Sequence, residues 1–235
     1  MNEIVDLSSK TCRSKNETGN KNEMQLQLSN SNQKPKLYYF NVTGLAEPIR
    51  YLLHYCNIEF EDIRFADFDE WINNYKNDMP MEQVPVLEID GVKYHQHKSI
   101  CEYIAKIYRL CGSTEKESLE MSALVDDFND MRAYVANYYK EDDAIFKSKL
   151  KERMEDKLPF FMNKFESRIV ENRGFFFNGK ISWVDIYYSG VCEVISNILQ
   201  RDLNEAHPNL KSLVDYVRKI DRIKKYIDLR PQTPL

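Results

Sequence analysis

The sequence predicts a small α/β domain followed by an all-helical domain. Up to about residue 111, short apolar and aromatic runs alternate with turn signals. Beyond that point, hydrophobic residues recur at helical spacing to the end of the chain. The length of 235 residues is enough for two modest domains or one large one. The two domains are expected at residues 35–111 and 113–235.

The elements of the first domain follow from local patterns. Strands are predicted at residues 37–40, 58–65, 84–89 and 92–94. A helix with Pro48 in its first turn follows Gly44, and a second helix is expected from about residue 97 to residue 110. Asp90-Gly91 is a hairpin turn signal between the last two strands. The order β-α-β-loop-β-β-α is that of a thioredoxin-like unit.

The second domain shows two helix starts. Thr114 and Glu117 have the spacing of a capping box, and Ser182 with Asp185 three residues later has the same spacing. From Trp183 onward the apolar stripe is wide, which is typical of a helix buried at the centre of a bundle. Its aromatic residues therefore indicate core packing and not a cofactor site.

Composition excludes several classes of function. The chain has 33 Lys and Arg against 37 Asp and Glu, a formal net charge of −4, which argues against a nucleic-acid partner. No stretch is apolar enough to span a bilayer, and the first residues lack the pattern of a signal peptide. We therefore expect a cytoplasmic protein without a membrane partner. Residues 1–34 are polar without periodicity and are expected to be a disordered extension.

The five cysteines and four histidines do not indicate a metal site. The cysteines are widely spaced and odd in number, without a Cys-x-x-Cys pair or zinc spacing, so reduced thiols are expected. His95 and His97 alternate near a strand end without a nearby carboxylate or cysteine. No metal is expected.

Seven motifs in order resemble the sigma class of the cytosolic glutathione transferases, a class related to haematopoietic prostaglandin D synthase. They are KLYYFN at 36–41, AEPIR at 46–50, VPVLEIDG at 84–91, HQ at 95–96, VD at 125–126 with Asp130, SWVD at 182–185 and RPQTP at 230–234. The stretch 131–138 is similar to arthropod members in particular. The resemblance begins at about residue 36.

The resemblance identifies Tyr39, at the end of the first strand, as the residue that activates the thiol of glutathione. A free thiol has a pKa of about 8.5. A hydroxyl that donates a hydrogen bond to the sulfur favours the thiolate, so it lowers that pKa. The alternative is that Tyr39 only fills the core. Tyr38 should take that role, because neighbouring side chains in a strand point to opposite faces.

Further site residues are implied by the same resemblance. Those that hold glutathione are Tyr39, Trp71, Lys76, Gln83, Val84, Gln96, His97 and, in the site of the partner subunit, Asp130. Those that line the electrophile pocket are Val42, Leu45, Asn137 and Tyr187. The Val84–Pro85 peptide bond is expected to be cis. No metal is required, and the expected assembly is a homodimer.

Four departures from the family pattern concern binding. His97 stands where the family has a serine that binds the γ-glutamyl carboxylate, and Glu82 stands where relatives usually have glycine. One extra residue lies between Trp71 and Lys76, and Leu45 replaces an arginine of vertebrate members. The resemblance also places the glycine end of glutathione at Trp71 and Lys76.

The function implied is conjugation of the glutathione thiolate to hydrophobic electrophiles, an EC 2.5.1.18 type of reaction. Lipid-derived aldehydes, aromatic halides and prostaglandin H2 all suit the pocket, so detoxification and a prostaglandin isomerase activity both stay open. The alternative is a non-catalytic structural or ligand-binding relative on the same scaffold. A glutaredoxin-type oxidoreductase would need a cysteine after the first strand, and residues 40–44 contain none.

Overall fold

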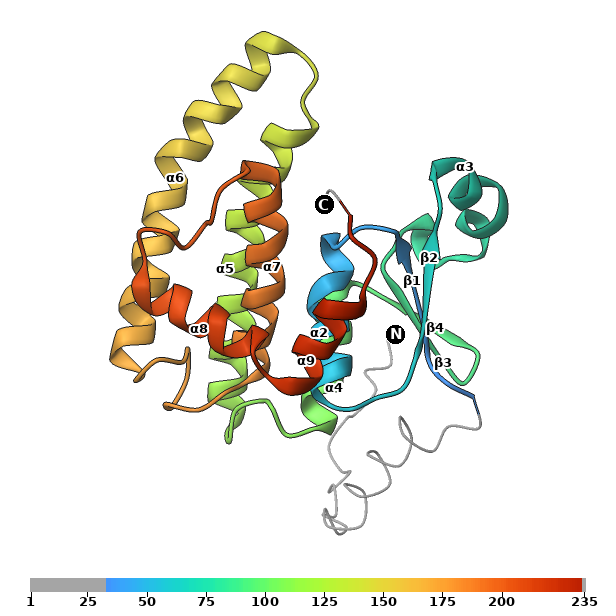
Figure 1. Ribbon diagram of the computed structural model, residues 1–235, viewed down its shortest axis with the longest axis horizontal. Coiled ribbons are helices and arrows are strands. Elements are labelled where there is room, and N and C mark those ends of the chain that lie inside the picture. Colours follow the sequence, from blue (N-terminus) through green and yellow to red (C-terminus); the bar gives the residue numbers. More distant parts are fainter. Residues whose placement is uncertain (1–32, 234–235) are drawn as a thin grey trace, which may run out of the picture.

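The computed structural model describes residues 33–233, and its N-terminal part is built on a four-stranded mixed sheet (Figure 1). The strands are β1 (Lys36–Phe40), β2 (Glu61–Phe65), β3 (Val86–Ile89) and β4 (Val92–His95). Their order is β2-β1-β3-β4, with β1 parallel to β2 and antiparallel to β3. The parallel pair needs a crossover. The 3-10 turn η1 (Gly44–Ala46) and helix α2 (Glu47–Tyr55) supply it.

The two faces of the sheet carry different clusters. Tyr39 belongs to the main core with α2 and α4 (His97–Ile107), whereas Tyr38 belongs to a second cluster with Phe65 and Trp71. The prediction that these neighbouring tyrosines face apart is therefore confirmed. Short segments between β2 and β3 accompany the second cluster. They are α3 (Phe68–Glu70), η2 (Trp71–Tyr75), η3 (Lys76–Asp78) and η4 (Pro80–Glu82).

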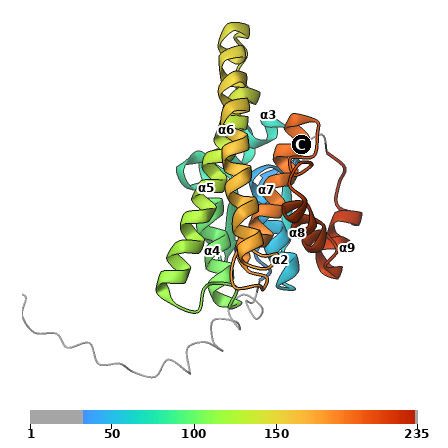
Figure 2. The same ribbon diagram turned by 90° about the vertical axis from the view of Figure 1, so that its left-hand side faces the viewer.

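The C-terminal part is helical. Its helices are α5 (Glu115–Lys140), α6 (Ala144–Glu171), α7 (Trp183–Leu199), α8 (Pro208–Arg218) and α9 (Asp221–Leu229). The two longest, α5 and α6, form a hairpin whose far end projects beyond the rest of the molecule (Figure 2). Thr114 caps α5 by accepting a hydrogen bond from the backbone N–H of Glu117 at 3.1 Å, as predicted.

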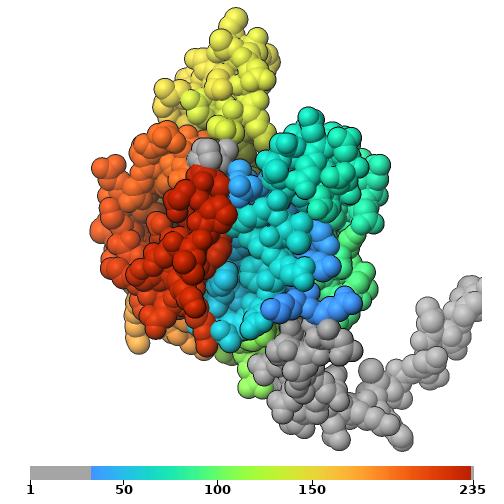
Figure 3. All heavy atoms as spheres, turned by 45° about the vertical axis from the view of Figure 1, so that its right-hand side comes forward, coloured from blue at the N-terminus to red at the C-terminus, as the bar shows by residue number. Residues whose placement is uncertain are grey.

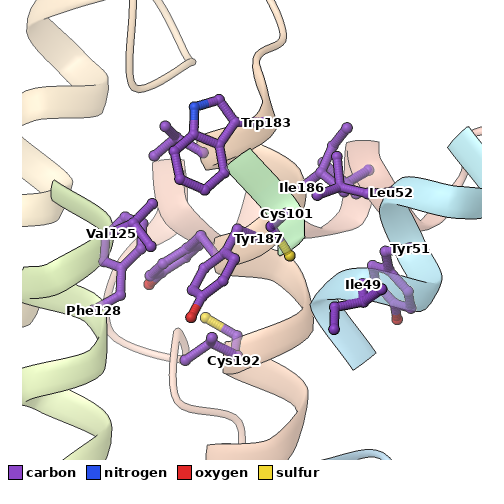
Figure 4. Close-up of a cluster of buried hydrophobic side chains, with 14 of the residues drawn as sticks. Ile49, Tyr51, Leu52, Cys101, Val125, Phe128, Trp183, Ile186, Tyr187 and Cys192 are labelled. Carbon is purple, nitrogen blue, oxygen red and sulfur yellow. The ribbon is translucent and has the colours of Figure 1, made fainter. Parts of the chain in front are cut away.

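Helix α7 lies at the centre of the bundle. It starts at the predicted cap, where the N–H and the hydroxyl of Ser182 both donate to Oδ2 of Asp185 at 2.7 Å. Of its 17 residues, 12 are buried, which matches the wide apolar stripe in the sequence. Figure 4 shows side chains of α7 packed among others from α2, α4 and α5.

The two parts meet where α7 crosses α2. A Cβ atom on Gly190 would lie 2.8 Å from the backbone nitrogen of Pro48, so this approach requires glycine. Helix α9 also packs against α2, and in Figure 3 the red C-terminal surface lies directly beside the cyan surface of this region.

The predicted fold class is confirmed, and most predicted element positions agree with the structure. Strand β2 starts at Glu61 and not at Ile58, because the N–H of Ile58 donates to the carbonyl of Leu53 and closes the end of α2. Strand β3 starts after Pro85, which has no N–H to donate. The expected extension at residues 1–34 lies almost wholly outside the described residues. Within 33–233, none of the helices is long and apolar enough to cross a membrane.

Candidate active site

The hydroxyl of Tyr39 is the centre of the predicted site. The side chain is only 9% exposed, and the backbone N–H of Leu45 donates a hydrogen bond to its oxygen at 3.0 Å. Within residues 33–233 the hydroxyl has no acceptor for its own proton. The oxygen is thus held in place by one donor, and the O–H remains available to a bound group.

Burial sets the protonation state of Tyr39. Loss of water raises the pKa of the phenol, while the Leu45 N–H and the charges of Arg50 and Arg132 act in the opposite direction. Because the net shift is upward, the phenol keeps its proton at neutral pH. It is therefore a hydrogen-bond donor there and not a general base.

Gly44 lets the loop after β1 approach Tyr39. Its φ of +45° lies in the left-handed region, and a Cβ atom would lie 2.5 Å from the Tyr39 hydroxyl oxygen. Any larger residue would displace either the ring or the N–H of Leu45. The close contact thus explains the glycine.

Arg50 holds the same loop in place through hydrogen bonds. Its Nη1 donates to the carbonyl of Val42 at 2.8 Å and to Oε2 of Glu47 at 3.1 Å. Its guanidinium carbon lies 5.9 Å from the centre of the Tyr39 ring. Both Arg50 and Glu47 are fully buried. The loop after β1 and the Tyr39 ring are therefore both in contact with Arg50.

Val84, two residues before β3, has an unpaired backbone within the described chain. The Val84–Pro85 bond is cis, as expected. The β1–β3 ladder ends at Tyr38 and Val86, and the backbone of Val84 makes no hydrogen bond to any described residue. An extended peptide could pair with such a backbone. Gln83, just before it, is extended and exposed.

Gln96 precedes α4 with φ +72° and an exposed side chain. This conformation is unfavourable for a residue with a Cβ, and such residues concentrate at functional sites. It places Gln96 beside the first N–H groups of α4, where the helix favours an anion.

His97 contacts the helical part. Its Nε2 lies 3.1 Å from Oδ1 of Asn129, which also accepts a hydrogen bond from the hydroxyl of Tyr187 at 2.9 Å. The amide nitrogen of Asn129 donates to the carbonyl of Val125, so Oδ1 is the acceptor and Nε2 of His97 carries a proton. Burial, with the charge of Arg132, lowers the pKa of His97.

The two residues predicted to bind the glycine end of glutathione, Trp71 and Lys76, contact other side chains. Trp71 is buried, stacked on Phe65 at 5.2 Å between ring centres. Lys76 forms an ion pair with Glu82 at 3.3 Å, and both side chains are exposed to solvent. The π-helix η2 lies where the resemblance implies one extra residue, and in it the N–H of Lys76 bonds to the carbonyl of Trp71, five residues back.

The predicted pocket residues lie in three places. Val42 and Leu45 are half-buried in the loop next to Tyr39, and Tyr187 is fully buried beside His97. Asn137 is exposed and lines a hollow of about 370 Å³ between α5 and α6, together with Asp130. The structure therefore does not place Asn137 next to the other three.

Asp130 is exposed on α5, and within the described chain it forms no ion pair or hydrogen bond. Over residues 33–233 no group of three or more His, Cys, Asp or Glu side chains could hold a metal ion.

Sequence reasoning assigned no role to Glu47, Arg50 or Arg132. The sequence did contain a signal that Glu47 and Arg50 form a pair. They carry opposite charges and lie three residues apart on helix α2, whose other residues around them are apolar. For Arg132 the signal is its place on α5 between the buried residues Met131 and Val135.

Two family models match the chain. They are "Glutathione S-transferase, N-terminal domain" over residues 35–106 and "Glutathione S-transferase, C-terminal domain" over residues 129–230.

The chain is also similar to individual proteins. Glutathione S-transferase S1 of Drosophila melanogaster is 41% identical over 198 residues, covering 84% of this chain and 79% of that protein. Human hematopoietic prostaglandin D synthase is 32% identical, with 85% and 98% covered. The structure of prostaglandin synthase D of Nilaparvata lugens superposes with a TM-score of 0.80 at 38% identity, covering 86% of this chain and all of that one.

Gly44→Ala should destabilise the fold by about 1–3 kcal/mol, because the methyl group adds a clash with Tyr39 to an unfavourable φ. Urea denaturation measures the loss. Gly91→Ala is the matched control, since Gly91 has φ +79° but open space around its Cβ position. Equal losses in the two variants would show that the Tyr39 contact has no effect.

Stability should fall between about pH 7.5 and pH 5.5 more steeply in the wild type than in His97→Gln. Since the pKa of His97 is lowered on folding, the unfolded chain binds more protons as the pH drops below about 6.5. Urea denaturation at several pH values tests this, with His95→Gln as the control that leaves His97 in place. Superimposable pH profiles for wild type and His97→Gln would contradict the assignment.

Proposed function

The chain belongs to the glutathione S-transferase family, and from this membership we propose that Tyr39 activates the thiol of glutathione. Conjugation of glutathione to an electrophile is its reaction, with glutathione as co-substrate. The observation that carries the role of Tyr39 is its hydroxyl, whose oxygen is fixed by the Leu45 N–H and whose proton has no acceptor in the described chain.

The chemistry requires one hydrogen bond. The protonated Tyr39 hydroxyl donates to the glutathione sulfur, and a hydrogen bond to a charged group is worth about 1.5–3 kcal/mol. At about 1.36 kcal/mol per pKa unit, this lowers the thiol pKa by about one to two units from about 8.5. The thiolate then becomes a large fraction near neutral pH and attacks the electrophile.

Backbone and helix-end groups hold the tripeptide. The unpaired backbone of Val84, after Gln83, receives the cysteinyl part of glutathione as an added strand. The γ-glutamyl carboxylate binds at Gln96 and the first N–H groups of α4. His97 contributes its backbone N–H there, because its ring is hydrogen-bonded to Asn129.

The glycine end of glutathione binds at Trp71 and Lys76. Lys76 reaches the carboxylate by leaving Glu82, its present partner. An exposed ion pair contributes only about 0–1 kcal/mol of free energy, so exchanging Glu82 for the carboxylate of glutathione costs little.

The working unit is a homodimer in the cytoplasm. The exposed Asp130 has no partner in the described part of its own chain, which suits a contact with the γ-glutamyl amine in the neighbouring subunit. The four cysteines of the described chain are free thiols, in keeping with a reducing compartment.

A second candidate activity is isomerisation of a prostaglandin endoperoxide. Relatives named prostaglandin D synthase favour it, among them the human protein and that of Nilaparvata lugens. Lipid-derived aldehydes remain the competing substrate class.

Tyr39→Phe should lower kcat with 1-chloro-2,4-dinitrobenzene by raising the activation free energy about 2–4 kcal/mol, because one donor to the reacting sulfur is lost. Thiolate absorbance of bound glutathione should show a raised thiol pKa. Tyr38→Phe, on the opposite face of the sheet, is the control. An unchanged thiol pKa would refute the role of Tyr39, and a wild type that binds glutathione without turnover would favour the non-catalytic alternative.

Light scattering should give twice the chain mass of 27.9 kDa. Asp130→Asn should weaken glutathione binding in calorimetry about tenfold, as expected for loss of one charged hydrogen bond. Asp126→Asn, which removes a neighbouring charge paired with Lys98, is the matched control. A monomer with full activity would be incompatible with a shared site.

A further inference from the structure

Arg230, directly after α9, bridges a carboxylate on α2 and one on α7. Helix α9 packs against α2 at this point (Figure 1). One guanidinium nitrogen of Arg230 donates to Oε1 of Glu47, and the other donates to Oε1 of Glu193. Glu47 is fully buried, and the other two side chains are nearly so. Tyr51 donates to the second oxygen of Glu193 at 2.6 Å, so that carboxylate is held in a fixed orientation.

Glu47 in turn contacts Arg50. Its other oxygen, Oε2, accepts a hydrogen bond from Nη1 of Arg50 at 3.1 Å, and the same nitrogen donates to the carbonyl of Val42 at 2.8 Å. Val42 belongs to the loop that carries the N–H of Leu45, which is the donor to the hydroxyl of Tyr39. Two ion pairs therefore connect the end of α9 with the loop that supports the proposed catalytic hydroxyl.

One donor of Arg50 is left unused by these contacts. Its Nη2 atom is buried and has no hydrogen-bond partner in the described chain. A guanidinium and a carboxylate favour a bidentate pair, in which two parallel N–H groups meet both oxygens. Glu47 does not form that pair, because Oε1 bonds to Arg230 and Oε2 alone bonds to Arg50. Since a buried donor without a partner is unfavourable, a Glu47 released from Arg230 would turn towards Nη2 and draw the guanidinium away from the carbonyl of Val42.

We propose that Arg230 is a positioning residue for the hydroxyl of Tyr39. By holding Glu47, it keeps Arg50 bonded to the loop after β1. That loop keeps the N–H of Leu45 on the hydroxyl oxygen, and a donor to this oxygen makes the O–H itself a stronger donor. The inference rests on the proposed function, because Tyr39 is the proposed donor to the sulfur of glutathione.

The experiment compares the wild type with Arg230→Gln, Glu193→Gln and Arg222→Gln. Glu193→Gln removes one carboxylate from Arg230 but leaves the contact with Glu47, so it is the control for lost stability. Arg222→Gln removes a positive charge from the exposed surface of the same helix, where Arg222 donates to the carbonyl of Tyr55 at 3.4 Å. Urea denaturation measures how much stability each variant loses.

Two measurements follow the hydroxyl of Tyr39. Hydrogen exchange of the Leu45 amide reports its bond to the phenol oxygen, and thiolate absorbance reports the pKa of bound glutathione. In Arg230→Gln we expect this amide to exchange about tenfold faster, kcat with 1-chloro-2,4-dinitrobenzene to fall about tenfold and the thiol pKa to rise, as for loss of one hydrogen bond. KM for glutathione should change less than about twofold, because the groups proposed to hold the tripeptide lie elsewhere. Both controls should keep the wild-type values.

A double variant separates positioning from stability. Because Arg230 is proposed to act through Tyr39, adding Arg230→Gln to Tyr39→Phe should lower kcat by less than about a further twofold. A full further tenfold loss would overturn the inference. So would an unchanged Leu45 exchange rate in Arg230→Gln, or an equal rise of that rate in Glu193→Gln. Should Arg230→Gln not fold, Arg230→Lys gives the same comparison, because one ammonium does not replace the planar fork between two carboxylates.

The exchange rate of the Leu45 amide needs neither substrate nor turnover, so the two proposals fail separately. An unchanged thiol pKa in Tyr39→Phe would refute thiol activation by Tyr39. An unchanged Leu45 exchange rate in Arg230→Gln would refute the role of Arg230, whatever Tyr39→Phe shows.

Discussion

The buried pair of Glu47 and Arg50 supports much of the structure around the site. Both side chains are fully buried, and Arg50 extends the pair to the carbonyl of Val42 and to Asp62 at the start of β2. Glu47 also accepts a hydrogen bond from Tyr226 of α9. Leaving one member of a buried pair alone costs about 3–5 kcal/mol. Because the loop at Tyr39, the sheet and the C-terminal helix share this pair, the geometry of the tyrosine hydroxyl depends on contacts between both parts of the molecule.

Local signals account for what the sequence could predict. The alternation at Tyr38 and Tyr39 and the cap at Ser182 are determined by residues within three positions of each other, and all were found in the structure. Long-range partners leave no such pattern. Tyr226 is 179 residues from Glu47. A lone arginine on α5 has the same sequence appearance as a solvated surface charge. The buried Nε of Arg132, which has no hydrogen-bond partner in the described chain, could therefore be recognised only in the structure.

The extra residue that the family resemblance implies before Lys76 coincides with a π-helix in the structure. An α-helical turn has 3.6 residues, and an added residue there would rotate every following side chain by about 100°. The π-helix from Trp71 to Tyr75 closes a wider turn with the bond from Lys76 to Trp71, and such a turn holds one residue more than an α-helical turn. Trp71 stacks on Phe65, and Lys76 begins the next segment, η3. The resemblance could reveal the insertion but not the turn that contains it.

The departures that the family resemblance implies concern the proposed binding of glutathione more than the proposed chemistry. Glu82, in place of glycine, pairs with Lys76 at the surface, and such pairs are worth about 0–1 kcal/mol, or at most about fivefold in affinity. The substitution at His97 removes a hydroxyl but retains the backbone N–H at the start of α4, and its ring contacts Asn129. Neither change reaches the Leu45 N–H or the hydroxyl of Tyr39. In the proposed site, the groups that hold the two ends of glutathione lie on η3 and α4, whereas the group that would bond to its sulfur, Tyr39, lies on β1. Glutathione binding can therefore weaken while the proposed activation of the thiol is retained.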